Sequence, residues 1–436
     1  MDYSPPAYSA SDKSTSAYES TVKRWPRILT QVIDELNAAF DECDGPKLAE
    51  AKILINSIAA LKYEIMHDRP LTALEEDGGT NIAIYNHELE VLNHSGLQTY
   101  RRLRFLFATT EYWEQYDPFA KQKIATFSSA APGVYALALS VNDLIQNHSE
   151  SSFNDTEHFH AAFLELAQVA LWGNATDLSL LQNLSHADIQ ALQKTGRAAQ
   201  QESQHLILAN DLEKAWSHVK GLKNRRIDIV LDNAGFEFEV VFHPKDIPWF
   251  VSDVLPDDFE KILVALADPQ FFNKAEDKTI CDPKHRAALA TCLSRWHTHL
   301  DAGRFRIRRS ELHQKDRTTG IAPESSIDNY WTNPLPFSLI PERSPELLEE
   351  LQKADLPDLA LSDARWRSTT AFERATGPLA GKISLLALRT LKADVCVGLQ
   401  DGVAERLDIE DPSWRVSGKY AVIGFSKATE VAGKKA

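Results

Sequence analysis

Apolar residues in the N-terminal half of the chain recur at the spacing of an amphipathic helix. Such stripes run over residues 29–40, 54–65 and 159–170. Gly45-Pro46 predicts where the second of these helices begins, and residues 185–208, rich in Ala, Gln and Leu, also predict a helix. We therefore expect an α-helical domain over residues 23–215. It follows a polar leader, residues 1–22, that we expect to be disordered.

The pattern changes after Arg226, where short β-branched and apolar runs predict strands. They cover residues 227–231, 238–242, 384–388, 395–397 and 420–425. Residues 256–268 predict a helix with a proline and acidic residues in its first turn. Strands that alternate with helices predict an α/β domain over residues 216–428, followed by a polar tail, residues 429–436.

Charge and composition narrow the classes of partner. The chain has 436 residues and a formal net charge of −15, which disfavours general binding to nucleic acid or to an anionic membrane. The negative net charge does not exclude binding of a small phosphorylated ligand. Without a signal-peptide pattern or an apolar run of about 20 residues, the sequence predicts a cytoplasmic protein, with nuclear residence and the oligomeric state left open. Four scattered cysteines predict free thiols.

Polar residues after predicted strands are candidates for chemistry, because ligands of open α/β sheets bind beyond the carboxyl ends of the strands. Asp232 and Asn233 follow the first strand, and Asp253 lies beyond the second. Their oxygen atoms suit a hard divalent cation that also binds a substrate phosphate. The alternative is that Asp232 and Asn233 form a turn or a helix cap. Arg389 and Lys392 follow a later strand, where two cations can hold a phosphoryl group.

Other motifs are absent or unspecific. The sequence has no P-loop, no GxGxxG, no GxSxG elbow and no Asp-x-Asp-x-Thr. Two His-x-His pairs, starting at His158 and His297, lie in predicted helices, where residues i and i+2 point to different faces, so zinc is disfavoured. The basic run of residues 304–309 is interpreted as a solvated strand or loop.

Four stretches in order along the chain resemble the DUF89 family of damage-control phosphatases, in its eukaryotic branch with an Arg-Thr-x-Lys motif. They are residues 229–237, 243–245, 248–254 and 388–394. The resemblance extends from about Trp25 to Phe425. It implies a three-layer, Rossmann-like α/β/α sandwich with an N-terminal helical domain.

The resemblance also implies a function and a site. The expected activity is metal-dependent hydrolysis of a sugar phosphate such as fructose 1-phosphate. Asp232, Asn233 and Asp253 would ligate Mn²⁺ or Ni²⁺, with Mg²⁺ and Co²⁺ as alternatives, and Asp232 or Asp253 would position the attacking water or act as the nucleophile. Lys392 and Arg389, with Asp232 and Asn233, would contact the substrate.

Two departures from the family leave alternatives open. The segment before Asp363 lacks the family's Gly-Asp-x-Asn-Tyr-Arg-Lys loop, which grips the substrate. Residues 232–237 are too few for the helix of a parallel crossover, so we expect a hairpin-like return between the first two strands. The chain could then be a non-catalytic relative that binds metal or a phosphorylated metabolite. After the phosphatase and the non-catalytic relative, a third alternative comes from the resemblance itself. The chain would then be an S-adenosylmethionine-dependent carboxyl methyltransferase in which Glu237 lies at the cofactor.

Overall fold

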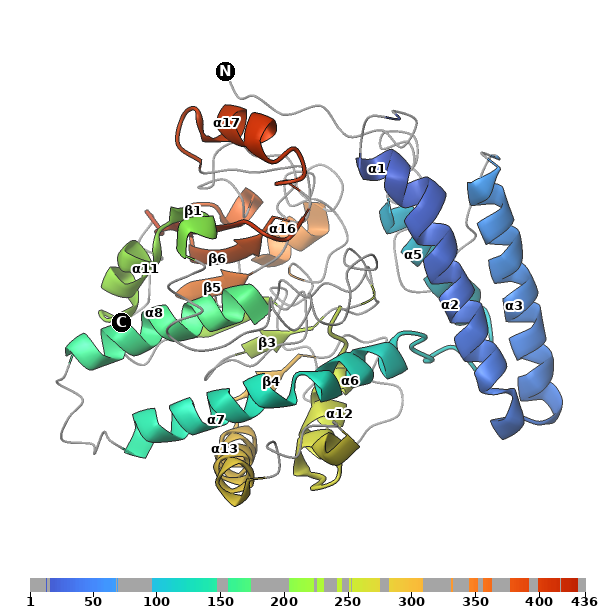
Figure 1. Cartoon of the computed structure of the whole chain (residues 1–436), viewed down its shortest axis with the longest axis horizontal. Coiled ribbons are helices and arrows are strands. Elements are labelled where there is room, and N and C mark those ends of the chain that lie inside the picture. Colours follow the sequence, from blue (N-terminus) through green and yellow to red (C-terminus); the bar gives the residue numbers. More distant parts are fainter. Residues whose placement is uncertain are drawn as a thin grey trace. The chain divides into compact units, whose positions relative to one another are not determined.

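The structure is a computed structural model in which the chain divides into two compact units (Figure 1). One unit comprises Pro5–Lys123 with Ile247–Ser252, and the other comprises Met1–Ser4, Ile124–Asp246 and Asp253–Ala436. We describe each unit by itself. The described residues are 13, 16–67, 69, 96–146, 156–173, 204–222, 226–230, 241–244, 251, 253–274, 282–308, 331, 345–351, 356–362, 377–391, 399–415 and 417–429.

The described part of the first unit is helical. Its elements are α1 (Ser16–Glu19), a π-helical turn (Ser20–Arg24), α2 (Trp25–Ala38), a 3₁₀ turn (Phe40–Glu42), α3 (Gly45–Met66) and α5 (Gly96–Ala108). The predicted stripes are confirmed, because Leu29, Val32 and Leu36 on α2 and Ile58 on α3 are buried. The expected disordered leader is too long, since the residues from Ser16 onward already form a helix.

The second unit contains a seven-stranded sheet. Its strands are β1 (Ile207–Asn210), β2 (Ile227–Val230), β3 (Val241–His243), β4 (Arg306–Ile307), β5 (Leu359–Ser362), β6 (Ser384–Thr390) and β7 (Ala421–Ser426). The strand order is β1-β7-β6-β5-β2-β3-β4. Neighbouring strands are parallel except β6 and β7, which are antiparallel.

Helices cover both faces of this sheet. The helices of the unit are α6 (Ala120–Ser129, whose first residues belong to the other unit), α7 (Ala131–Gln146), α8 (Thr156–Gly173), α11 (Leu212–Val219), α12 (Pro256–Ala267), α13 (Pro283–Asp301), α16 (Pro345–Leu351) and α17 (Val403–Glu410). Leu386 and Leu388 of β6 pack with α8 and α11. On the opposite face of the sheet, Val422, which pairs with Arg389, packs with Leu407 of α17. The predicted α/β sandwich with a helical part is confirmed.

Two expectations from the sequence are wrong in detail. The end of the predicted helix 185–208 is β1, because Ile207 and Ala209 pair with β7. The expected hairpin-like return between β2 and β3 is also wrong, since the two strands are parallel neighbours. The described residues of the two strands are Ile227–Val230 and Val241–His243, and residues 231–240 between them lie outside the described part of the chain.

Several smaller expectations can be compared with the described residues. Both His-x-His pairs lie in helices, α8 and α13. Of the cysteines, Cys43 and Cys292 are described and both are free thiols. Among the described helices, none taken singly combines the length and apolar character of a membrane span, although the bent pair Ala120–Ser128 and Gly133–Asp143 meets that test jointly.

Leu386 tests the packing of the sheet against α8. The side chain is 2% exposed within an apolar cluster. Leu386→Ala should lower the free energy of unfolding by about 2–5 kcal/mol, because it removes buried methyl groups and leaves a cavity. Urea denaturation followed by circular dichroism measures the change. Ile409→Ala, at a side chain that is 84% exposed, should change stability by less than about 0.5 kcal/mol.

Candidate functional site

The order of the strands defines a switch point between β2 and β5. From β2 the chain continues outward to β3 and β4, whereas β5 and β6 follow on the other side of β2. Ligands of open α/β sheets bind outside the carboxyl ends of the strands at such a point. The last ladder row here contains Val230, His243, Ser362 and Ala387. The residues that follow this row are the natural candidates for a site.

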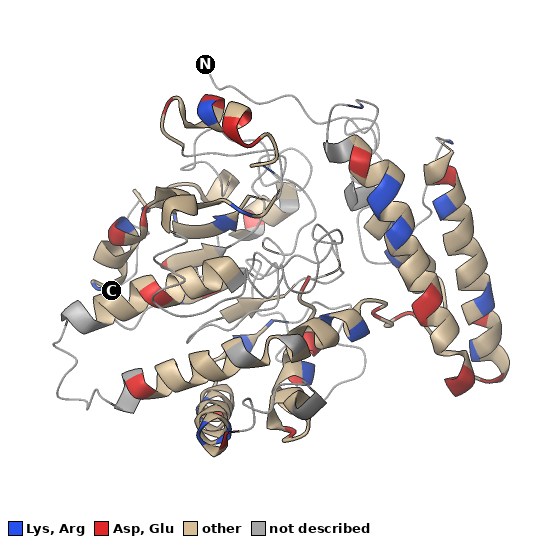
Figure 2. Cartoon of the chain, viewed as in Figure 1, with Lys and Arg blue, Asp and Glu red and all other residues tan. Residues whose placement is uncertain are grey.

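Charged residues are rare on the strands, so those that occur stand out (Figure 2). Within the described strands, Asp228, Arg306 and Arg389 are the only Asp, Glu, Lys or Arg residues. Asp228 is fully buried and Arg389 is 7% exposed. A buried charge is costly without partners, which points to specific interactions around these side chains.

Asp228 is the centre of a buried polar cluster with Arg226 and His243. Arg226 donates from Nε to Oδ1 of Asp228 at 2.6 Å and from Nη2 to Oδ2 at 2.8 Å. Nε2 of His243, on β3, lies 3.0 Å from Oδ2. His243 is 1% exposed, and its ring lies 6.4 Å from that of Trp331. The cluster therefore joins the two parallel strands β2 and β3 through side chains as well as backbone.

The pKa of Asp228 reflects two opposing effects. Burial of the carboxyl group favours the neutral form, whereas the hydrogen bonds and charges of His243 and Arg226 favour the carboxylate. The partners prevail and hold the pKa of Asp228 below its usual value. The ionised carboxylate accepts hydrogen bonds only, so Nε2 of His243 carries the proton and donates it.

Two buried guanidinium groups flank the switch point. Arg308 follows β4, is 6% exposed, and donates its backbone N–H to the carbonyl of Phe242 at 2.9 Å. If the register of β3 and β4 is continued by one residue, Arg308 lies opposite His243 and on the same face of the sheet. Ala387 of β6 is in the same ladder row as His243, so Arg389, two residues further on, also lies on that face. β4, which Arg308 follows, and β6, which carries Arg389, each lie two strands from β2. At about 4.8 Å per strand, this is a distance of about 10 Å.

The burial of Arg308 corrects one sequence interpretation. The basic run of residues 304–309 was expected to be a solvated strand or loop. Arg304 is exposed, but Arg308 is buried at the end of β4. Arg304 lies in the bend before β4, whereas Arg308 directly follows the strand and bonds to β3, so their places relative to the sheet account for the difference.

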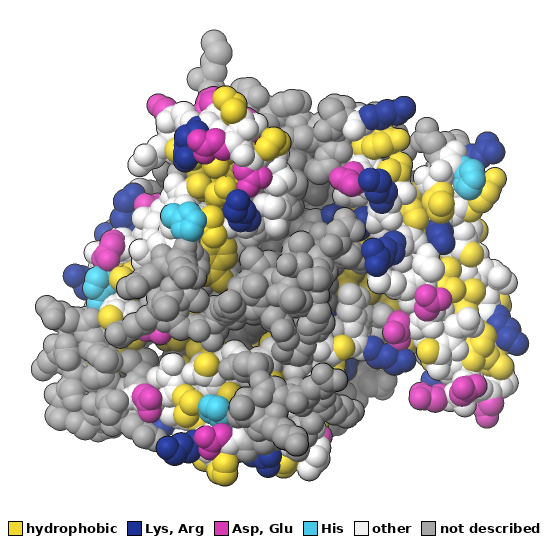
Figure 3. Space-filling view, viewed as in Figure 1, with side chains coloured by type: hydrophobic (Ala, Val, Ile, Leu, Met, Phe, Trp, Pro, Cys, Tyr) yellow, Lys and Arg dark blue, Asp and Glu magenta, His cyan; other side chains and the backbone are white. Residues whose placement is uncertain are grey.

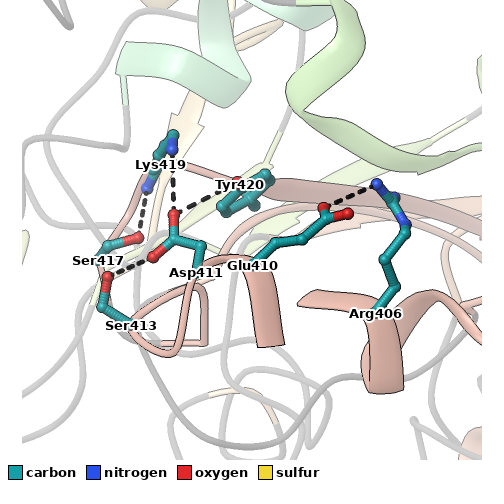
Figure 4. A network of polar contacts seen from close by, with 7 residues as sticks. All are labelled: Arg406, Glu410, Asp411, Ser413, Ser417, Lys419 and Tyr420. Atoms are coloured by element: carbon teal, nitrogen blue, oxygen red, sulfur yellow. Dashed lines mark hydrogen bonds and ion pairs between the residues drawn. The ribbon is translucent and has the colours of Figure 1, made fainter. Parts of the chain in front are cut away.

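The chain beyond Arg389 is held by the segment after α17. Leu391 donates its N–H to the carbonyl of Tyr420 at 2.7 Å. Asp411 holds this segment through Ser413, Lys419 and Tyr420 (Figure 4). Hydrogen bonds from Ser413 and Lys419 lower the pKa of Asp411. The backbone immediately before Lys392 is thus anchored at the N–H of Leu391.

The structure describes only part of the predicted site. Asp253 is 1% exposed, and its neighbour Val254 packs with Ile229 and Phe242 of β2 and β3. Asp232, Asn233, Glu237 and Lys392 lie outside the described residues. Among the residues that are described, no group of three or more His, Cys, Asp or Glu side chains could hold a metal ion. Whether the predicted ligands assemble therefore stays a prediction.

Asp228, His243 and Arg308 are candidates that sequence reasoning missed. An aspartate inside the run Ile227–Val230 is a usable signal, because Asp is depleted in strands and especially costly in a buried one. His243 lies in the stretch 243–245 that carries the family resemblance, but the sequence did not indicate its partner, which lies on another strand. On the face drawn in Figure 3, the described acidic and basic side chains are interspersed.

A parallel α/β sheet with buried charges beside its switch point is typical of enzymes that bind small ligands at this edge. Comparison with known proteins identifies the family. The model of the damage-control phosphatase ARMT1-like domain matches residues 20–407. The chain therefore belongs to the ARMT1-like damage-control phosphatase family, whose members are in general metal-dependent.

Curated relatives cover the whole chain. The Damage-control phosphatase ARMT1 of Xenopus tropicalis is 30% identical over 479 residues, 97% of this chain and 99% of the relative. The Mus musculus protein of that name is 30% identical over 480 residues, and the Homo sapiens protein is 27% identical over 475. The alignment covers 97% of this chain, or about 423 of its 436 residues. About 56 of the 479 aligned positions, 479 minus 423, therefore stand opposite gaps in this chain.

The Asp228 cluster predicts a pH dependence of stability. The pKa of Asp228 is lower in the folded than in the unfolded chain. Its contribution is therefore complete above the unfolded value of about 3.9 and is lost as the pH falls through the folded pKa. Asp228→Asn should lower the free energy of unfolding at pH 7 by about 3–5 kcal/mol, because it leaves Arg226 with a neutral partner. The difference from wild type should shrink below about pH 4.

Urea denaturation between pH 3 and pH 7 measures this effect. Asp401→Asn, at an exposed position before α17, is the matched control and should leave the unfolding free energy near wild type. A constant difference between wild type and Asp228→Asn over the whole pH range would contradict the assigned charge state.

Proposed function

We propose that this chain hydrolyses sugar phosphates, such as fructose 1-phosphate, with the help of a divalent metal ion, Mn²⁺ or Ni²⁺. The observation that carries the proposal is family membership over residues 20–407. The sheet supports it, because two buried guanidinium groups, Arg308 and Arg389, occur at the ends of β4 and β6, and the proposed ligand Asp253 is also buried. We also propose a cytoplasmic location for the enzyme, as expected from the sequence.

The chemistry of the donor set fits such a metal. Asp232, Asn233 and Asp253 offer two carboxylates and an amide carbonyl, the oxygen ligands that hard divalent ions prefer. Asp232 is two residues beyond Val230, so its Cα lies at most about 7–8 Å from that strand end. Connectivity thus limits the distance between Asp232 and the carboxyl end of β2. When bound there, the ion would polarise a phosphoryl oxygen and neutralise developing charge.

The remaining residues would bind and orient the substrate. Arg389 and Lys392 would hold the phosphate from one side of β2, the arginine by a two-pronged contact and the lysine as a point charge. Arg308 is a further candidate on the other side of β2. Asp232 or Asp253 would position the attacking water or act as the nucleophile.

The gaps in the alignment favour a second candidate function, a relative that binds metal or phosphate without turnover. About 56 aligned positions of the Xenopus tropicalis protein have no counterpart among the about 423 matched residues of this chain. If the missing positions include the substrate-binding loop, the chain would keep its metal ligands but lack much of its phosphate-binding site. Binding without phosphate release would identify this case.

The first test measures phosphate release from fructose 1-phosphate by the purified chain with Mn²⁺, and again after EDTA. We expect release that EDTA abolishes. Asp232→Asn should abolish release while the circular dichroism spectrum is unchanged, because it removes one charged ligand. Asp401→Asn is the exposed control and should retain wild-type turnover. Turnover that survives in Asp232→Asn would exclude this site.

A second test concerns the guanidinium groups. Arg389→Lys keeps the charge but removes the two-pronged geometry, so KM for fructose 1-phosphate should rise about tenfold or more, which corresponds to at least about 1.4 kcal/mol. Arg406→Lys on α17, where the exposed arginine pairs with Glu410 at 3.0 Å, is the matched control and should leave KM unchanged. Steady-state kinetics on folded protein measures both. Equal KM values for Arg389→Lys and wild type would remove Arg389 from the phosphate site.

A further inference from the structure

The cluster of Arg226, Asp228 and His243 has a position that core packing alone does not require. Asp228 lies in the middle of β2, four residues before Asp232, and its side chain is 0% exposed. His243 is the last residue of β3, the strand from which the chain continues toward Asp253. The two strands that lead to the proposed metal ligands are therefore the two strands that this cluster joins.

Among the described residues, the backbone ladder between these two strands is short. β2 has four residues and β3 has three, and their ladder consists of Asp228 with Val241, Ile229 with Phe242, and Val230 with His243. A slip of one residue would turn every side chain to the other face of the sheet. A charge-assisted hydrogen bond from His243 to Asp228 reaches diagonally across this ladder and opposes such a slip.

Stability alone is a weak reason for a buried ion pair. Replacing such a pair by well-packed apolar residues is often neutral or stabilising, because desolvation of the charges offsets their attraction. The two-pronged contact from Arg226 fixes the Asp228 carboxylate in the plane of the guanidinium group. The carboxylate in turn fixes the tautomer and the orientation of the His243 ring.

We propose that Arg226, Asp228 and His243 form a positioning cluster that fixes the ends of β2 and β3 relative to each other, and thereby the separation of Asp232 and Asn233 from Asp253. The inference rests on the proposed function, because it takes these three residues as the metal ligands. The cluster itself touches neither metal nor substrate. Its loss should act on metal affinity first, because displaced strand ends would move the ligands apart, and the 10–100-fold that groups bonded to metal ligands contribute sets the upper limit.

The test is a titration of the full-length chain with Mn²⁺, in which electron paramagnetic resonance measures the free ion. Asp228→Asn should raise the Kd for Mn²⁺ about 10–100-fold. The matched control is Asp117→Asn in the other compact unit, where Asp117 and Lys123 form a pair 2.8 Å apart with side chains only 6% and 7% exposed. This variant also breaks a buried ion pair, but its Kd should stay within about twofold of wild type.

A second pair of variants covers the case in which Asp228→Asn does not fold. His243→Gln retains an N–H donor for Asp228, whereas His243→Leu has none. The Kd of His243→Gln should therefore lie closer to wild type than that of His243→Leu. Circular dichroism at the titration temperature confirms that each variant compared is folded.

The outcomes separate this inference from the proposed function. A wild-type chain that binds Mn²⁺ but releases no phosphate would overturn the phosphatase proposal, and the variants would still decide on the cluster. Equal Kd values for Asp228→Asn and wild type, or an equal loss in Asp117→Asn, would overturn the positioning role while phosphatase activity stands. A wild-type chain that binds no divalent ion would overturn both.

Discussion

A carboxylate without access to water, in the middle of a short strand, constrains much of the second unit. Asp228 can stay ionised there only because Arg226 and His243 supply charge and hydrogen bonds in a fixed geometry. Arg226 directly precedes β2 and His243 ends β3, so the requirement ties the register of both strands. The polar cluster thus specifies the pairing of β2 and β3 that their few backbone hydrogen bonds only weakly define.

The pairing of β2 and β3 in turn decides where the ligand-binding edge lies. With β3 and β4 on one side of β2 and β5 and β6 on the other, the switch point falls beside β2. Arg308 and Arg389 then lie two strands from β2 on either side, both buried. A negatively charged ligand at this edge would have positive charge on both flanks, although the chain as a whole carries −15.

Family membership and the gaps in the alignment bear on different halves of the site. The positions assigned to the metal are present in the sequence as Asp232, Asn233 and Asp253. The loop expected to grip the substrate before Asp363 is missing from the sequence. In phosphoryl transfer, positioning and charge stabilisation supply most of the catalysis, so the substrate half limits what the chain can do. In the proposed site, the two buried arginines Arg308 and Arg389 would replace part of that positive charge.

The sequence by itself determined the local elements of this protein. Apolar residues at helical spacing located α2, α3 and α8, and β-branched or apolar runs located β2, β6 and β7, because these periods follow from the geometry of single elements. It also carried the motif residues that indicate the family. Only the tertiary structure decided that β2 and β3 are parallel, that Arg308 is buried while Arg304 is exposed, and that His243 meets Asp228. These facts depend on which strands pair and what covers them, and separation along the chain does not encode either one.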